Sequence, residues 1–175
     1  MRKLKNNELG RISVENFKKE EKTPIVVVLD NVRSAFNVGS VFRTSDAFRI
    51  ERIYLCGITA CPPHKDIRKS ALGSTESVDW KKIDCTEKII SELKRKGYNV
   101  YAVEQTSESI LLNDVKQNDI PIAFVFGNEV NGVSQEVINL CDGSIEIPQI
   151  GIKHSLNISV SAGIILWDFW KKISM

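Results

Sequence analysis

Short apolar runs recur along the chain and predict the strands of a buried sheet. The run from Pro24 to Leu29 is a continuous stretch of β-branched and aliphatic residues, which is typical of a strand covered on both faces. Pro121–Phe126 is a second run of the same kind. With the weaker runs included, the expected strands are Pro24–Leu29, Arg52–Cys56, Tyr98–Val103, Pro121–Phe126 and Ser144–Ile147.

Between these runs, apolar residues recur at helical spacing. Thr86–Lys96 has its apolar side chains on one face, a threonine at its start that can cap the helix, and Gly97 at its end. Cys61–Lys69 contains two adjacent prolines and is expected to be a loop. The expected helices are Val38–Phe48, Thr86–Lys96, Ser134–Leu140 and Ser155–Ile173.

The last of these helices, Ser155–Ile173, is apolar on two faces. Leu156, Val160, Gly163 and Trp167 form one face, and Ile158, Ala162, Ile165 and Phe169 form the other. A helix with two apolar faces is buried on two sides. We interpret one face as packing on the sheet of its own chain and the other as packing on a partner subunit.

Strands that alternate with helices predict an α/β fold, with a mostly parallel sheet and helices on both faces. The sequence has no internal repeat, no low-complexity tract and no interdomain linker. We therefore expect a single domain over residues 24–175, preceded by a short N-terminal extension over residues 1–23.

Composition narrows the class of protein without identifying its function. Lys+Arg 24 against Asp+Glu 22 gives a net charge of +2, so any RNA-binding surface must be a local patch. The basic start of the chain has no apolar run behind it, and no segment approaches the roughly 20 apolar residues of a membrane span. The four cysteines form no CxxC pair, which indicates reduced thiols and no metal site. A cytoplasmic protein is expected.

Polar residues follow the first expected strand. The segment Asp30–Ser40 lies at the carboxyl edge of that strand, where open α/β sheets bind ligands. Within it, Asn37 can cap the helix that begins at Val38. Arg43 lies further along this helix among apolar neighbours, where it serves either a ligand or a structural salt bridge.

A second polar segment, Phe124–Val133, runs from an apolar strand into a tight turn. Gly127 would let a ligand approach the backbone closely, and Glu129 offers a carboxylate just beyond it. The alternative is an ordinary connection between a strand and a helix, with Asn131-Gly132 as its turn.

A third segment, Ile145–Asn157, leads into the last helix. If that helix begins near Ser155 and Leu156, their backbone N–H groups are free donors for a ligand. The alternative gives Ser155 a capping role and places Asn157 on the polar surface of the helix.

Together, these segments resemble the three signature motifs of the SpoU (TrmH-type) branch of the SPOUT RNA methyltransferases. The resemblance extends from about Pro24 to Lys172. It consists of Asn37-x-Gly39-x-x-x-Arg43-x-x-Asp46-Ala47, Phe126-Gly127-Asn128-Glu129-x-x-Gly132, and Ile147-Pro148 followed by Ser155-Leu156-Asn157-x-Ser159-x-Ser161.

The resemblance implies a fold, a reaction and a set of site residues. The fold is an α/β sheet whose C-terminal part forms a deep trefoil knot, in a homodimer with active sites at the subunit interface. The reaction is methyl transfer from S-adenosylmethionine to a ribose 2′-hydroxyl of tRNA or rRNA, without a metal. The implied catalytic positions are Arg43, Asn37, Glu129, Ser155 and Asn157, and the donor would be held around Gly127, Ile147, Leu156 and Ser155.

Such a reaction needs mainly in-line placement of the hydroxyl and removal of its proton. A guanidinium has a pKa above about 12, so Arg43 is a poor free base. We expect Arg43 to hold an RNA phosphate and to stabilise the developing alkoxide, while Glu129, Ser155 and Asn157 order it. The sequence has no counterpart of the additional terminal segments of many family members. The identity of the substrate RNA is therefore not determined, and tRNA is slightly preferred.

Two other classes of function compete with this interpretation. One is a non-catalytic RNA-binding module of the same fold, and the intact set of site residues weighs against it. The other is a nucleotide-linked oxidoreductase, which would need a GxGxxG motif after the first strand. The segment Ser34–Gly39 supplies only one glycine there.

Overall fold

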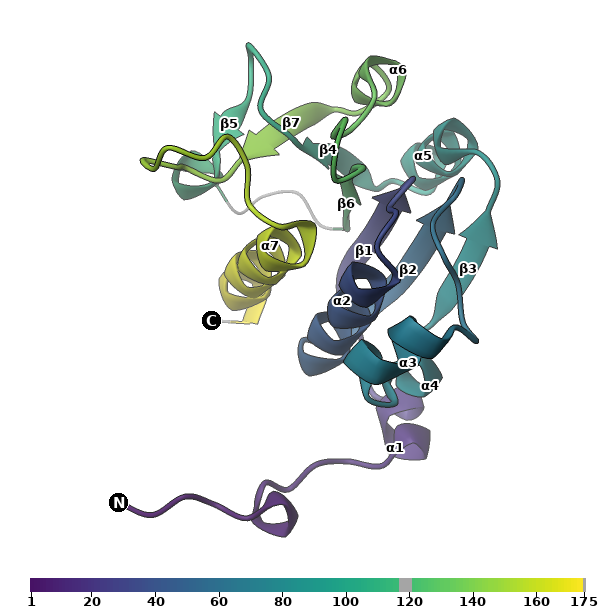
Figure 1. The fold of residues 1–175 in the computed structure, drawn as a ribbon, viewed down its shortest axis with the longest axis vertical. Coiled ribbons are helices and arrows are strands. Elements are labelled where there is room, and N and C mark those ends of the chain that lie inside the picture. The colour runs from purple at the N-terminus through teal and green to yellow at the C-terminus, as the bar shows by residue number, and fades with distance from the viewer. Residues whose placement is uncertain (117–120, 175) are drawn as a thin grey trace.

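The computed structural model describes residues 1–116 and 121–174 and contains a seven-stranded sheet with helices packed around it (Figure 1). All pairs of these strands are parallel, in the order β3-β2-β1-β6-β4-β7-β5. The strands are β1 (Thr23–Asp30), β2 (Ile50–Cys56), β3 (Trp80–Ile83), β4 (Asn99–Val103), β5 (Ile110–Leu111), β6 (Ile122–Phe126) and β7 (Gly143–Glu146). The expected α/β class with a mostly parallel sheet is confirmed.

The two strands that the sequence did not predict are β3 and β5, which lie at the two edges of the sheet. β3 reads Trp-Lys-Lys-Ile, and its two lysines interrupt the apolar pattern. β5 is only two residues long, and both are exposed. Edge strands are commonly short or charged, so they lack the apolar run by which a buried strand is recognised.

The described helices include seven α-helices and two short 3-10 turns. They are η1 (Asn6–Glu8), α1 (Val14–Lys19), α2 (Ala35–Ala47), α3 (Lys65–Ala71), α4 (Ser74–Ser77), α5 (Thr86–Arg95), η2 (Leu112–Asp114), α6 (Gln135–Ile138) and α7 (Ile158–Ser174). None of the helices in the described part of the chain is long and apolar enough to cross a membrane.

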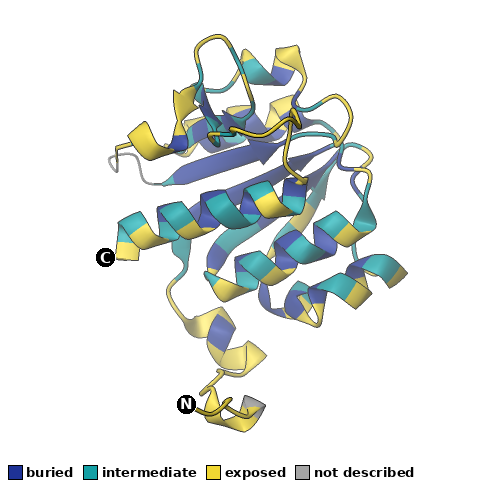
Figure 2. Cartoon of the chain, turned by 60° about the vertical axis from the view of Figure 1, so that its left-hand side comes forward, coloured by how far each residue is buried: buried dark blue, intermediate teal, exposed yellow. Residues whose placement is uncertain are grey.

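Alternate residues of β1 face two separate cores. Val27 and Leu29 belong to the core under α2, α3 and α7, where the rings of Phe124 and Phe169 lie 4.6 Å apart. Val28 belongs to the second core, under α5 and α6. Figure 2 shows α2 and α7 side by side over the buried strands. The expectation of helices on both faces of the sheet is therefore confirmed.

The N-terminal ends of three helices differ from the sequence-based expectation in their start or in their capping residue, although α5 begins at Thr86 as expected. α2 begins before Val38, and its N-cap is Ser34, whose hydroxyl accepts from the Asn37 N–H, so the capping role expected for Asn37 is wrong. The Thr86 hydroxyl donates to the buried Asp30 carboxylate instead of capping α5. Helix α3 begins at Lys65, inside the expected loop, because His64 caps it.

The start expected for the last helix is also wrong. α7 begins at Ile158, so Ser155 and Leu156 lie in the preceding loop. Asn157 caps the helix instead, because its Oδ1 accepts the Ser159 N–H at 2.9 Å. A short polar side chain with its oxygen at this position replaces a missing intrahelical acceptor.

The two faces of α7 have different surroundings. Ala162 and Ile165 are fully buried against the chain's own core, as expected for one face. On the other face, Val160 and Trp167 are each 49% exposed. The second face is therefore an apolar surface that the chain itself does not cover.

Within residues 1–23, α1 packs against the main body, and Thr23 is already the first residue of β1. Phe17 is 5% exposed, and the helix contacts α4. Ser13 caps α1 by accepting from the Asn16 N–H. The residues before α1 extend away from the sheet in Figure 1.

The close packing of α2 on α3 makes a prediction about Gly39. A Cβ at this position would lie 2.5 Å from the Ile67 carbonyl oxygen and 3.0 Å from the Ala71 nitrogen. Backbone atoms of a packed helix cannot move away easily, so Gly39→Ala should lower the free energy of unfolding by about 1–3 kcal/mol. Urea denaturation measures this change. Ser40→Ala on the same helix is the control and should stay within about 0.5 kcal/mol of wild type; equal stability of the two variants would contradict the prediction.

Candidate active site

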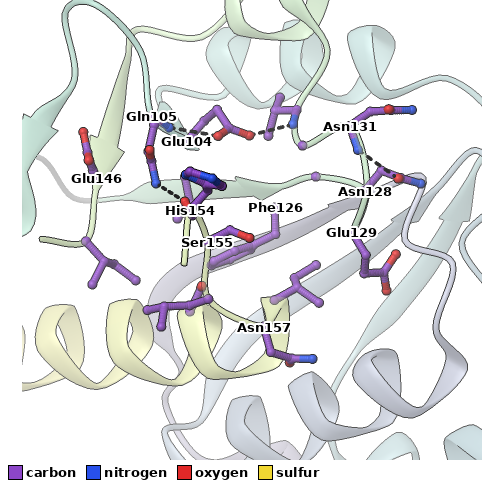
Figure 3. Close-up of a pocket in the computed structure, with 18 of the residues that line it drawn as sticks. Glu104, Gln105, Phe126, Asn128, Glu129, Asn131, Glu146, His154, Ser155 and Asn157 are labelled. Carbon is purple, nitrogen blue, oxygen red and sulfur yellow. Dashed lines mark hydrogen bonds between the residues drawn. The ribbon is translucent and has the colours of Figure 1, made fainter. Parts of the chain in front are cut away.

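A pocket of about 720 Å³ lies at the carboxyl edge of the sheet, as expected for a ligand site in an open α/β fold (Figure 3). Three segments line it: the end of β4, the turn after β6 over residues 127–133, and the loop between β7 and α7. The second and third polar segments of the sequence therefore meet in one cavity.

The turn after β6 is closed by its own backbone. Asn128 and Gly132 exchange backbone hydrogen bonds of 3.0 and 2.9 Å, and Gly132 has a φ of +65°. A Cβ on Gly127 would lie 2.2 Å from the Val133 nitrogen. Gly127 lines the pocket, and its lack of a side chain is also required by the turn itself.

The Asn128 side chain fixes this turn to the end of β1. Its Nδ2 donates to the Asn31 carbonyl at 2.8 Å, and its Oδ1 accepts the Val130 N–H at 2.8 Å. Asn128 belongs to the second motif, for which its sequence position suggested no role of its own. The structure shows that it joins the second motif to the first.

Glu129 accepts three hydrogen bonds from the first motif. They come from the Arg33 N–H at 2.8 Å, the Ser34 N–H at 3.0 Å and the Asn37 Nδ2 at 2.9 Å. Burial raises the pKa of the Glu129 carboxyl, but these hydrogen bonds outweigh burial and leave the pKa below its ordinary value of 4.5. Glu129 is therefore ionised at neutral pH.

Asn37 connects Glu129 to the third motif. While its Nδ2 donates to Glu129, its Oδ1 accepts from the Asn157 Nδ2 at 3.2 Å. Three of the expected catalytic residues, which are far apart in sequence, thus form one hydrogen-bonded row. Glu129 and Asn157 both line the pocket, so the row lies at its rim (Figure 3).

Ser155, Leu156 and Ile147 also line the pocket. The N–H groups of Ser155 and Leu156 make no hydrogen bond to any residue that the structure describes. They are free donors, as expected from the sequence, although they belong to a loop and not to the first turn of a helix.

Arg43 lies apart from this group. It is on the exposed side of α2 and is not among the residues that line the pocket. Within residues 1–116 and 121–174 it makes no ion pair and no hydrogen bond, so the alternative of a structural salt bridge finds no support.

Three further polar residues line the pocket that the sequence motifs did not predict: Glu104, Gln105 and Glu146. Their position could have marked them as site residues, because they lie at or just after the end of a strand, at the same sheet edge as the three motifs. With Glu129, the described lining contains three carboxylates and neither lysine nor arginine. The pocket therefore favours a ligand that carries a positive charge.

Among the described residues, no group of three or more His, Cys, Asp or Glu side chains is placed to hold a metal ion. The cysteines are free, and burial raises the pKa of the Cys56 thiol to about 12. A thiol with so high a pKa is a weak nucleophile and a weak metal ligand.

Comparison with known proteins gives the family. The model of the SpoU rRNA Methylase family matches residues 24–167. A Staphylococcus haemolyticus protein named for the TrmH family of tRNA/rRNA methyltransferases is 30% identical over 159 residues, which are 91% of this chain and 63% of that protein. A tRNA (guanosine(18)-2′-O)-methyltransferase of Aquifex aeolicus is 31% identical over 160 residues, which are 88% of this chain and 72% of that enzyme.

Solved structures agree with this result. The TrmH/SpoU tRNA modifying enzyme of A. aeolicus has a TM-score of 0.81 at 29% identity, over 92% of this chain and 82% of that one. An AdoMet-bound rRNA methyltransferase from Sinorhizobium meliloti has a TM-score of 0.80 at 26% identity, over 89% of this chain and 59% of that one. The similarity confirms the α/β-knot fold class. The chain belongs to the SpoU rRNA methylase family.

Proposed function

We propose that this chain transfers a methyl group from S-adenosylmethionine to a ribose 2′-hydroxyl of tRNA or rRNA. The observation that supports this most is the row Glu129–Asn37–Asn157, which joins the three motifs at the rim of the pocket. The names of the relatives support the same reaction class. The methyl donor and such RNAs are cytoplasmic, and we place the reaction there.

The pocket fits the proposed donor in size and in charge. Its volume of about 720 Å³ lies in the range of small-molecule sites. Its three carboxylates suit a sulfonium cation, and the free N–H groups of Ser155 and Leu156 can donate to the donor's polar atoms. When bound, S-adenosylmethionine supplies a methyl group that is already activated. The chain's task is then to place and polarise the accepting hydroxyl.

The row of polar side chains can orient that hydroxyl. Glu129 stays ionised, and its oxygens are occupied by N–H donors, so it fixes Asn37 and does not itself take a proton. The guanidinium of Arg43 can bind a phosphate and stabilise a developing alkoxide. A non-catalytic RNA-binding module would have no need of this alignment beside a donor pocket.

We further propose that the active form is a homodimer. The uncovered face of α7, with Val160 and Trp167 each 49% exposed, lies beside α2, whose Phe36 is 50% exposed. Apolar groups gathered on one face favour association with another protein surface. Arg43 is on the exposed side of α2, so a partner subunit docked on these helices brings Arg43 to the subunit interface.

The proposed donor predicts selective stabilisation. At a concentration 100 times its Kd, S-adenosylhomocysteine should stabilise the fold by about 2.7 kcal/mol, which raises Tm by about 5–10 °C for a chain of this size. Thermal unfolding with and without the ligand measures the shift. NAD is the matched control and should leave Tm unchanged; a larger shift with NAD would instead support the oxidoreductase class.

The role of Arg43 predicts a loss of turnover without a loss of fold. Arg43→Ala should reduce single-turnover methylation of RNA about 100-fold or more, because a charge that stabilises the transition state is removed. Arg43→Lys should also be impaired, because an ammonium lacks the planar fork of the guanidinium. Stability should change by less than about 0.5 kcal/mol at this exposed position.

The control for this experiment is Arg95→Ala, which removes an exposed arginine from α5. It should retain wild-type turnover and donor affinity. Near-normal turnover of Arg43→Ala, or rescue by Arg43→Lys, would exclude the proposed role.

If the chain forms a homodimer through the uncovered face of α7, disrupting this face should lower the molecular mass in solution. Trp167→Glu should convert the dimer to a monomer in light scattering, because a buried unpaired carboxylate costs several kcal/mol at an interface. Ile58→Glu is the control, because Ile58 is 68% exposed and lies in the loop after β2, on neither α2 nor α7. A monomeric wild-type protein with full activity would refute the dimer.

A further inference from the structure

The end of β4 carries two consecutive polar side chains that reach in different directions (Figure 3). Glu104 points to the turn over residues 127–133, where its Oε2 accepts the Val133 N–H at 3.0 Å. Gln105 points to the loop between β7 and α7, where its Nε2 donates to the His154 carbonyl at 2.7 Å. These two residues thus contact both of the other segments that line the pocket.

The loop contacted by Gln105 has little else to hold it. The side chains of Ile150 and Ile152 are fully exposed. Among the described residues, the bond from Gln105 to His154 is the only hydrogen bond between residues 148–156 and another part of the chain. Apart from the attachment of the loop to α7 at Asn157, the segment that carries the free N–H groups of Ser155 and Leu156 is therefore held by Gln105.

Glu104 is fixed against the turn over residues 127–133, on the side of the pocket opposite the loop that Gln105 contacts. Its second oxygen, Oε1, accepts the Gln105 N–H at 2.9 Å, so the carboxylate is held by two backbone donors. A Cβ on Gly132 would strike Glu104 Oε2, which shows how closely the carboxylate lies against the turn. Removing the carboxylate would leave the partly buried Val133 N–H without its acceptor.

We propose that Glu104 and Gln105 are positioning residues that hold the two loops of the donor pocket at the spacing that binds the donor. This inference rests on the proposed function, because it assigns the pocket to S-adenosylmethionine. The pair acts through Val133 and His154 and takes no part in the transfer step. Its loss should therefore weaken donor binding and leave the placement of RNA and the chemical step intact.

The experiment compares full-length wild type with Gln105→Met, which keeps the length of the side chain but cannot donate, and with Glu104→Gln. Calorimetry with S-adenosylhomocysteine should show a Kd raised about three- to tenfold for Gln105→Met, and about tenfold or more for Glu104→Gln, where a charged acceptor is lost. The KM for S-adenosylmethionine should rise with Kd, while kcat and the KM for RNA stay near wild type. Gln135→Met and Glu108→Gln, exposed on other segments, should behave as wild type.

A second measurement needs no donor. In the donor-free protein, ¹⁵N order parameters of the amides of residues 149–156 should fall in Gln105→Met, while Tm is unchanged. Wild-type Kd and order parameters in Gln105→Met would overturn the proposal, as would a joint loss of Tm, kcat and RNA binding. If wild type fails to bind S-adenosylhomocysteine, the proposed function fails, and the order parameters alone decide whether Gln105 positions the loop.

Discussion

The turn from Gly127 to Gly132 can close only because neither glycine has a side chain, and the geometry of the site depends on this closure. A Cβ on Gly127 would overlap the backbone nitrogen of Val133, and a Cβ on Gly132 would overlap the carboxylate of Glu104. The closed turn places Glu129 where it reaches Arg33, Ser34 and Asn37, more than 90 residues earlier in the chain. A steric condition on two positions thereby fixes an electrostatic contact between the second and first motifs.

That contact lies at the start of α2, where the backbone N–H groups give the helix a positive end. The carboxylate of Glu129 is favoured there by the helix dipole as well as by its direct donors. Burial opposes the charge, yet the net pKa of Glu129 is lowered. The donors therefore outweigh the cost of burial, and Asn37 is held by an acceptor that remains ionised throughout the neutral range.

The parts of the fold and of the site that local sequence determines were predicted from the sequence. The parts that depend on tertiary contacts were not. Buried strands such as β1 are specified by their own apolar runs, whereas β3 has lysines and forms through pairing with β2. The start of α7 was misplaced because Ser155 and Asn157 are both good capping residues, and only the three-dimensional path of the loop selects Asn157. The motif residues that meet in the pocket were found by their pattern, while Glu104 and Gln105 belong to no motif and are identified only by their contacts.

The carboxylates of the pocket and the guanidinium of Arg43 differ in the groups that they contact. Each carboxylate that lines the pocket accepts from uncharged groups of its own chain: Glu104 and Glu129 from N–H groups, and Glu146 from the Ser109 hydroxyl at 2.8 Å. None of them forms an ion pair in the described structure, so the negative charge of the pocket is not neutralised. Arg43 likewise has no carboxylate partner among the described residues. Acidic groups that hold loops around the pocket, and a basic group on α2 left free for phosphate, suit the cationic donor and the anionic RNA that we propose.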